Sequence, residues 1–423
     1  MGPAEALADL AGASTLAPVF DEGLKFTSWT SMDFFLDWLN LGLRWFHVIA
    51  GVAWIGASFY FNWLEGNLER LGKPQHLQGD LWAVHGGGFY QVLKYQGAPE
   101  TLPKTLHWFK WEAYMTWISG FSLLVLIYYV NSKVYLVDPS KYPLSEFQAI
   151  SIGVATLVIG WLVYHGLCRT KLCQKPLIFG AILFALLGLV AFGLDQIFNS
   201  RGAYIHVGAL IGTWMVGNVF FIIIPSQKKM VAAAQKGEDP PDPHQAKHAG
   251  LRSLHNNYFT LPLLFIMISQ HYPATYQHAL PWLILMLLSI AGVLIRQYFN
   301  RKNFGFKEPL WLVAGAIVIG MTMGLTIPQS EESQTAATSQ VSDIEAAAII
   351  QERCRSCHAA APADDVFTVT PNGVAFDNMT QIRAQAQSMY NRIMVVKNMP
   401  FANKTAMTDE EREALGAWLK QLD

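Results

Sequence analysis

The chain has 423 residues, of which 52% are hydrophobic and 14% charged, whereas about a quarter of the residues of soluble domains are charged. With a mean hydropathy of +0.25 and 14 Trp, this composition excludes a disordered chain, a fibre and an ordinary soluble enzyme, and favours a membrane protein with a smaller polar part. The net charge of -1 gives no indication of a basic surface that would bind nucleic acid. Four cysteines in a chain of this length do not indicate a fold built on disulfide bonds.

Residues 1–33 are mixed and moderately polar. They lack the cationic stretch and the short apolar core of a cleaved signal peptide. We therefore expect residues 1–33 to form an N-terminal segment that precedes the first membrane helix.

Eight apolar segments follow, and most approach the ~20 residues that a helix needs to cross a hydrocarbon core of ~30 Å. They cover residues 41–61, 113–130, 149–167, 177–198, 204–224, 255–270, 280–298 and 310–327. The sequence thus predicts an all-α fold, a polytopic eight-helix transmembrane bundle over residues 34–327 of the chain. The segment 255–270 is the least regular, because it is short and opens with His-Asn-Asn.

The cationic residues between these segments predict the orientation. If the N-terminus lies outside, nearly all Lys and Arg of the connecting loops lie inside, and the outside segments hold only Lys25, Lys133, Lys141 and Arg201. The positive-inside rule therefore predicts a multi-pass protein embedded in the lipid bilayer, with both termini on the non-cytoplasmic side.

After residue 327 the composition changes. Residues 328–341 are rich in Ser, Thr, Gln and Glu, which predicts a flexible linker, and residues 342–423 have the composition of a small soluble domain. Helices are expected over Ser342–Cys354, Thr380–Lys397 and Thr408–Leu422, where Thr380 is the expected N-cap of the second. Thr408 and Glu411 form the capping box of the third.

Within this domain, Cys354-Arg355-Ser356-Cys357-His358 is the C-x-x-C-H signature of covalent haem c. The thiols of Cys354 and Cys357 would form thioethers to the porphyrin, and His358 would be the proximal ligand of the iron. A zinc or redox pair is the alternative. A helix before the motif and a capped helix at the end favour a class I-like cytochrome c domain.

A methionine thioether is the expected sixth ligand of the iron, as in other cytochromes with His and Met ligation. We expect Met399, because Pro400 ends the preceding helix and would present the side chain from a loop. Met379, Met389, Met394 and Met407 are the alternatives. Since haem c is attached outside the cytoplasm, the domain would be periplasmic, in agreement with the charge pattern.

Three other features concern the membrane part. Cys168 and Cys173, at the cytoplasmic end of a span, are expected to be reduced structural thiols. His47 and His206 share the phrase His-Val-x-Ala, which suggests two four-helix halves. At matched depth these two histidines could ligate a second, non-covalent haem b, and the alternative is that each forms a hydrogen bond to a neighbouring helix.

Polar and aromatic residues gather in the inside loops and at the start of the short span 255–270, where Pro262 interrupts the helix pattern. Single residues of this kind can be interfacial anchors, but the cluster favours a binding site. Its members are His85, Lys94, His107, Lys110, Trp111, Arg252, His255, Asn256 and Asn257.

Several long phrases resemble the bacterial membrane-bound urate oxidases, or urate hydroxylases, that carry a C-terminal cytochrome c domain. These phrases are LRWFHVIAGVAWIGASFYF, LWAVHGGGFYQVLKY, LHWFKWEAYMTWISGFSLLVLIYY, RGAYIHVGALIGTWMVGNVFFIIIP, RSLHNNYFTLPLLFIMISQHYP and CRSCH. The resemblance implies that urate is oxidised to 5-hydroxyisourate without hydrogen peroxide. Electrons would leave through the cytochrome to a soluble cytochrome c or a terminal oxidase.

Urate is a planar aromatic anion, so its binding calls for aromatic stacking, a cation and amide groups. Under this resemblance His85 and His255 are the candidate catalytic bases, because histidine titrates in the right range. The candidate substrate ligands are Lys94, His107, Lys110, Trp111, Arg252, Asn256 and Asn257.

A cytoplasmic site would lie most of ~30 Å from a periplasmic haem and would need an electron relay. The alternative is a site near the periplasmic face, around Arg44, His47, Arg201 and His206. Two other functions remain open, a quinol-to-cytochrome electron conduit and a transporter with a fused cytochrome. A homo-oligomer is also left open.

Overall fold

The structure is a computed structural model of the 423-residue chain. It describes residues 31–139, 141–238, 243–327, 341–364, 367, 370–395, 397 and 399–422. The predicted N-terminal segment up to residue 30 and the predicted linker over 328–340 therefore lie outside the described residues.

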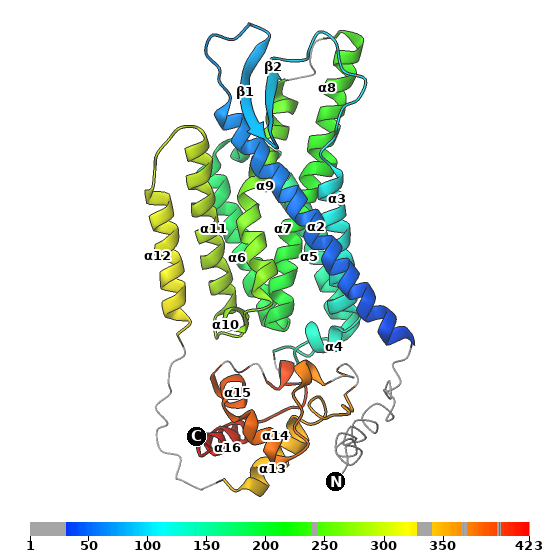
Figure 1. The fold of residues 1–423 in the computed structure, drawn as a ribbon, viewed down its shortest axis with the longest axis vertical. Coiled ribbons are helices and arrows are strands. Elements are labelled where there is room, and N and C mark those ends of the chain that lie inside the picture. Colours follow the sequence, from blue (N-terminus) through cyan, green and yellow to red (C-terminus); the bar gives the residue numbers. More distant parts are fainter. Residues whose placement is uncertain are drawn as a thin grey trace, which may run out of the picture.

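Long helices run up and down to form the first part of the molecule (Figure 1). They are α2 (Ser31–Asn67), α3 (Trp111–Leu124) with its π-helical end η2 (Val125–Tyr129), α5 (Glu146–Leu167), α6 (Pro176–Ile197), α7 (Ser200–Gly217), η4 (Asn218–Ile223), α8 (Ile224–Lys236), α9 (Pro243–Ser269), α11 (Pro281–Asn303) and α12 (Leu310–Leu325). The connections hold α4 (Ser132–Tyr135), η3 (Lys171–Gln174) and α10 (Pro273–Tyr276). Each of the eight predicted apolar segments coincides with one of the long helices.

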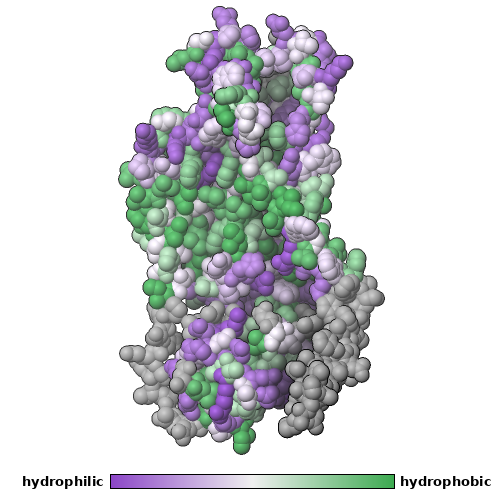
Figure 2. All heavy atoms as spheres, in the orientation of Figure 1, coloured by the Kyte–Doolittle hydropathy of each residue, from purple (hydrophilic) through white to green (hydrophobic). Residues whose placement is uncertain are grey.

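Among the described residues, five helices are long and apolar enough to cross a membrane, namely Phe35–Asn67, Glu146–Leu167, Pro176–Ile197, Ser200–Lys236 and Pro281–Asn303. α12 is a shorter apolar helix. On the face that Figure 2 shows, a broad hydrophobic belt crosses the middle of the bundle, with hydrophilic residues above and below it. The belt is what a lipid-facing surface requires, and the count of eight spans stays a prediction.

The all-α prediction is wrong for one loop. Strands β1 (Leu77–His85) and β2 (Gly88–Tyr95) form an antiparallel hairpin with His85 opposite Gly88. Gly86 and Gly87 make the two-residue turn, with φ angles of 56° and 80° that a residue with a side chain rarely adopts. Leu81 packs with Leu64 and Leu68, which fixes the hairpin to the end of α2.

The C-terminal part is a small helical domain below the bundle, at the end opposite to the hairpin (Figure 1). Its elements are α13 (Asp343–Arg353), η5 (Pro371–Gly373), α14 (Met379–Ala384), α15 (Ala386–Tyr390), η6 (Asn391–Val395), η7 (Phe401–Asn403) and α16 (Asp409–Lys420). Its core includes Trp418, Ile350 and Leu415.

The capping box predicted at the start of the last helix is confirmed. Ser342 caps α13, and Thr408 with Glu411 forms the predicted capping box of α16. The single helix predicted from Thr380 is wrong, because the N-cap is Asn378 and the helix is interrupted at Gln385. The Asn378 side chain accepts a hydrogen bond from the backbone of Gln381, which starts the helix two residues earlier than expected.

Candidate functional site

The C-x-x-C-H motif follows directly from the end of α13. Cys354 is the C-cap residue, and the backbone N–H of His358 donates to the carbonyl of Cys354 at 2.9 Å. The Nδ1 atom of His358 lies 2.8 Å from the carbonyl oxygen of Val374. Since a carbonyl only accepts, Nδ1 carries the proton, and the lone pair of Nε2 is left for a metal.

The predicted haem ligands line one cavity of about 350 Å³. Cys354, Cys357 and His358 lie on one side of its lining, and Met399 comes from the loop before η7. Met389 also lines the cavity, whereas Met407 is buried in the core and only 3% exposed. The cavity thus brings together all four residues that sequence reasoning assigned to the haem, from two separate segments.

Hydrogen bonds hold the loop that carries Met399. The Arg412 guanidinium donates from Nη1 to the carbonyls of Ile393 and Met399, at 2.8 Å each. Both carbonyls therefore have a fixed partner on α16. The backbone of this loop at Met399 is therefore held both by the last helix of the domain and by Arg392, whose carbonyl accepts from the Met399 N–H at 3.3 Å.

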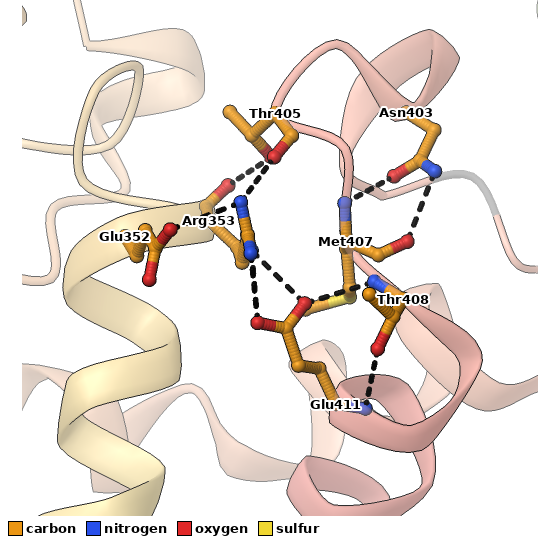
Figure 3. A network of polar contacts seen from close by, with 7 residues as sticks. All are labelled: Glu352, Arg353, Asn403, Thr405, Met407, Thr408 and Glu411. Carbon is orange, nitrogen blue, oxygen red and sulfur yellow. Dashed lines mark hydrogen bonds and ion pairs between the residues drawn. The ribbon is translucent and has the colours of Figure 1, made fainter.

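A second network joins the motif to α16 (Figure 3). Arg353, the last residue of α13, donates to Glu411 from Nε at 2.9 Å and from Nη2 at 2.8 Å, and to the carbonyl of Thr405 at 2.7 Å. The Thr405 hydroxyl donates back to the Arg353 carbonyl at 2.8 Å. Hydrogen bonds from Arg353 lower the pKa of the Glu411 carboxyl, so this pair is ionised at neutral pH.

The two thiols are neutral at neutral pH. Burial raises the pKa of Cys354 to about 12 and also raises the pKa of Cys357. Among the described residues, no three His, Cys, Asp or Glu side chains are grouped as they would be to hold a metal ion. Two thiols, an imidazole with a free Nε2 and a thioether around one cavity fit a covalent haem.

The membrane-type part of the chain holds a buried polar cluster, built on Tyr164, Asn218, Arg252, His255 and Asn256. Arg252 donates to the side-chain oxygen of Asn218 at 2.9 Å, and its guanidinium lies 5.0 Å from the ring centre of Tyr164. The amide of Asn218 donates to the Tyr164 hydroxyl at 2.9 Å and to Asn256 at 2.8 Å.

His255 completes this cluster. Its Nδ1 atom lies 2.9 Å from the Tyr164 hydroxyl, and its ring stacks on Phe179 with centroids 5.1 Å apart. Sequence reasoning placed Arg252, His255 and Asn256 together, and they are together. It missed Tyr164 and Asn218, which come from α5 and η4, because nothing local in the sequence links residues so far apart.

The other predicted substrate ligands are elsewhere. His85 is exposed at the hairpin turn. Lys94, at the other end of the hairpin, forms an ion pair with Glu65 of α2. His107 and Trp111 are largely exposed, with Lys110 over the Trp111 ring at 5.5 Å. The structure therefore does not join His85 with His255.

Asn257 is turned away from the cluster. Its side-chain oxygen accepts from Nε of Arg296 on α11 at 2.8 Å, and the Arg296 guanidinium lies 3.8 Å from the ring centre of Phe59. Arg296, like Asn218, is a buried polar residue of a span that sequence reasoning did not single out, although its charge inside an apolar helix is a usable signal.

His47 and His206 each have protein partners. Nδ1 of His47 lies 3.0 Å from the carbonyl of Thr116 and 3.0 Å from the hydroxyl of Ser119. His206 is fully buried, with Nδ1 at 2.8 Å from the Gly202 carbonyl and Nε2 at 3.1 Å from the Tyr129 hydroxyl. These are the contacts expected of the hydrogen-bond alternative, and haem b stays a prediction. Cys168 and Cys173 are buried free thiols.

A domain of long apolar helices carries these buried polar clusters, and a cavity with a C-x-x-C-H motif follows it. Residues 33–327 match the family model described as urate oxidase N-terminal, and the chain therefore belongs to this family. The membership indicates a urate-related oxidoreductase, as the resemblance of the sequence implied. No curated protein and no solved structure matches the chain. The family match ends at residue 327, before the domain with the C-x-x-C-H motif.

Proposed function

We propose that the protein is a membrane-bound urate oxidase that delivers its electrons to a covalent haem c in its own C-terminal domain. The observation that carries the proposal is the cavity lined by Cys354, Cys357, His358 and Met399, in a domain fused to a urate oxidase family region. The long apolar helices support the location in a membrane.

The reaction balances without hydrogen peroxide. Urate and one water give 5-hydroxyisourate, two protons and two electrons, so the oxygen atom of the new hydroxyl comes from water. A haem c takes up and passes on one electron at a time, so each urate requires two transfers to an external acceptor. A soluble cytochrome c or a terminal oxidase of the respiratory chain is the acceptor that we propose.

The roles of the chain's own residues follow from the site. Cys354 and Cys357 would hold the haem through thioethers, His358 would offer Nε2 to the iron, and Met399 would supply the second protein ligand. The Val374 carbonyl fixes the tautomer of His358 at 2.8 Å. Hydrogen bonds from Arg412, and the ion pair of Arg353 with Glu411, hold the two segments that carry these residues on α16.

The orientation of the chain supports a periplasmic haem domain. The C-terminal domain contacts the bundle at Tyr135, whose ring centroid lies 5.4 Å from that of Phe401. Tyr135 lies between Lys133 and Lys141, two of the few cations that the positive-inside rule leaves outside. We propose the bacterial inner membrane as the location, with both termini in the periplasm.

Spectroscopy of the haem tests the proposed function. Purified membranes are given urate, then quinol, while the α-band of reduced haem c is recorded. Reduction by urate, with 5-hydroxyisourate formed and no hydrogen peroxide, supports the oxidase. Reduction by quinol alone points to the electron conduit, and uptake of a solute with no reduction points to the transporter.

A further inference from the structure

Two residues of the bundle line the same cavity as the C-x-x-C-H motif. Arg201 lies in the first turn of α7, and Tyr135 ends α4. The Arg201 guanidinium lies 5.3 Å from the ring centre of Tyr135 and 5.8 Å from that of Phe401. Phe401 is two residues after Met399, so the bundle reaches the loop of the expected haem ligand.

Behind Arg201 lies a glutamine whose hydrogen bonds are incomplete. Nε of Arg201 donates to the side-chain oxygen of Gln270 at 2.7 Å, and the Tyr128 hydroxyl donates to the same oxygen at 2.5 Å. The amide nitrogen of Gln270 is buried and has no partner among the described residues, and the same holds for the side-chain oxygen of Gln277. A buried donor without an acceptor is costly, so these groups call for a ligand.

We infer that urate binds at this boundary between the bundle and the C-terminal domain, which rests on the proposed function. The Arg201 guanidinium meets the charge of the purine anion, and the amide nitrogen of Gln270 donates to a ring carbonyl. The ring of Tyr135, over which the Arg201 guanidinium lies at 5.3 Å, adds an aromatic group to this boundary. Arg392 and Lys404, the latter paired with Asp364, also line the cavity and make its surroundings favourable for an anion.

The cluster around Arg252 is a weaker substrate site for two reasons. Asn218 and Asn256 already use both ends of their amides within the protein, although Nε of Arg252 is buried and has no partner among the described residues. It is also distant, because Asn218 lies 17 residues after Arg201 along one continuous helical run, which is ~25 Å at 1.5 Å per residue. Urate bound at Arg201 would lie beside the haem cavity. Its electrons would therefore not have to cross the membrane to reach the haem.

Equilibrium dialysis with radiolabelled urate tests this site. The full-length holoprotein is purified in detergent and kept reduced, so that it binds urate without turning it over. R201Q is expected to weaken urate binding about tenfold or more, since a charge-assisted contact is lost, and Q270L should weaken it several-fold. R201K should recover part of the loss. R301Q, which removes an arginine paired with Glu308 at the far end of α11, is the matched control and should bind like wild type.

The haem itself reports whether the variants are intact. R201Q should keep its covalently bound haem and its reduced spectrum, so that a loss of urate binding is not a loss of fold. Wild-type affinity in both R201Q and Q270L overturns the inference. So does an R201Q protein whose haem midpoint potential shifts while its urate affinity is unchanged, because Arg201 then serves the haem alone. If urate neither binds to wild type nor reduces its haem, the proposed function fails as well; if urate reduces the wild-type haem and R201Q binds urate normally, only this site is wrong.

Discussion

Single side chains decide which methionine is offered to the iron. Met399 lines the cavity with His358, while Met407 is buried in the core of the C-terminal domain, and its backbone N–H and carbonyl are both bound to Asn403. We therefore expect Met399→Ala to abolish the sulfur-to-iron charge-transfer band of the oxidised protein and to lower the haem midpoint potential.

Met407→Ala is the matched control for that experiment. It should keep the band, and its cost should appear instead as a loss of about 2–5 kcal/mol of stability, because it leaves a hole in the core. Loss of the band in Met407→Ala, with the band kept in Met399→Ala, would move the ligand to Met407.

His206 distinguishes two interpretations of the bundle, in which this histidine either ligates haem b or forms hydrogen bonds within the protein. The haem b hypothesis predicts extractable haem b beside covalent haem c in the detergent-purified protein, which pyridine haemochrome analysis measures. It also predicts that His206→Ala loses haem b and keeps haem c. Wild-type protein with haem c alone would leave His206 as a hydrogen-bonding residue between Gly202 and Tyr129.

At the scale of residues, sequence reasoning succeeded where one short segment carries the chemistry. Cys354, Cys357 and His358 are adjacent, and Met399 could be found because Pro400 marks a loop. The polar cluster was only half visible, since Arg252, His255 and Asn256 lie on one helix whereas Tyr164 and Asn218 join it through packing. Arg201 and Gln270 meet across 69 positions, and their contact needs the folded chain.

The helix α16 is held in place by contacts at its N-terminal end. Its first turn contains the Thr408–Glu411 capping box, and Glu411 also receives two hydrogen bonds from Arg353. The same carboxylate therefore caps one helix and joins it to another, the helix that leads into the C-x-x-C-H motif.

The pH dependence of the C-terminal domain should follow from this carboxylate. The pKa of Glu411 is lowered in the folded state, so its stabilisation is present above its unfolded value of about 4.3 and is lost as pH falls below it. Glu411→Gln keeps the cap and removes the charge, and should cost about 0.5–1 kcal/mol at neutral pH.

The measurement is thermal unfolding of the full-length protein, followed by the haem absorbance at neutral pH and near pH 3. The difference between wild type and Glu411→Gln should shrink at the acidic pH. A difference that is the same at both values would show that the charge of Glu411 contributes nothing.

The hairpin explains why element prediction failed in the first long loop of the membrane-type part. Long apolar runs predict helices well, because length and composition suffice to cross a membrane. The segment 77–95 has neither, and its signal was the alternation of residues around Gly86 and Gly87, a strand pattern with a two-residue turn. His85, the candidate base, is the last residue of β1 and lies directly before this turn.

The whole molecule has its two polar ends on opposite sides of the apolar belt, with the hairpin and α8 at one end and the C-terminal domain at the other (Figures 1 and 2). α12 ends at the same end of the bundle as the one where α7 begins, which is also the end that the C-terminal domain contacts. The arrangement therefore predicts that all segments at that end of the bundle lie on the same side of the membrane.

Reporter fusions test this sidedness. A reporter joined after residue 336 should be active only in the form that works in the periplasm, and one inserted at Gly237, a C-cap glycine with a φ of 68°, only in the form that works in the cytoplasm. Eight crossings place the two positions on opposite sides, because three separate Gly237 from the linker. If only the five helices that meet the length and hydropathy criteria cross, Pro281–Asn303 is the one crossing between the two positions, and it also places them on opposite sides.

A third reporter after residue 306, between α11 and α12, distinguishes the two counts. It lies on the same side as Gly237 if α9, α11 and α12 all cross. It lies on the same side as residue 336 if α11 alone crosses. Cytoplasmic activity at residue 306 with periplasmic activity at residue 336 supports eight crossings; periplasmic activity at both would remove α9 and α12 from the membrane.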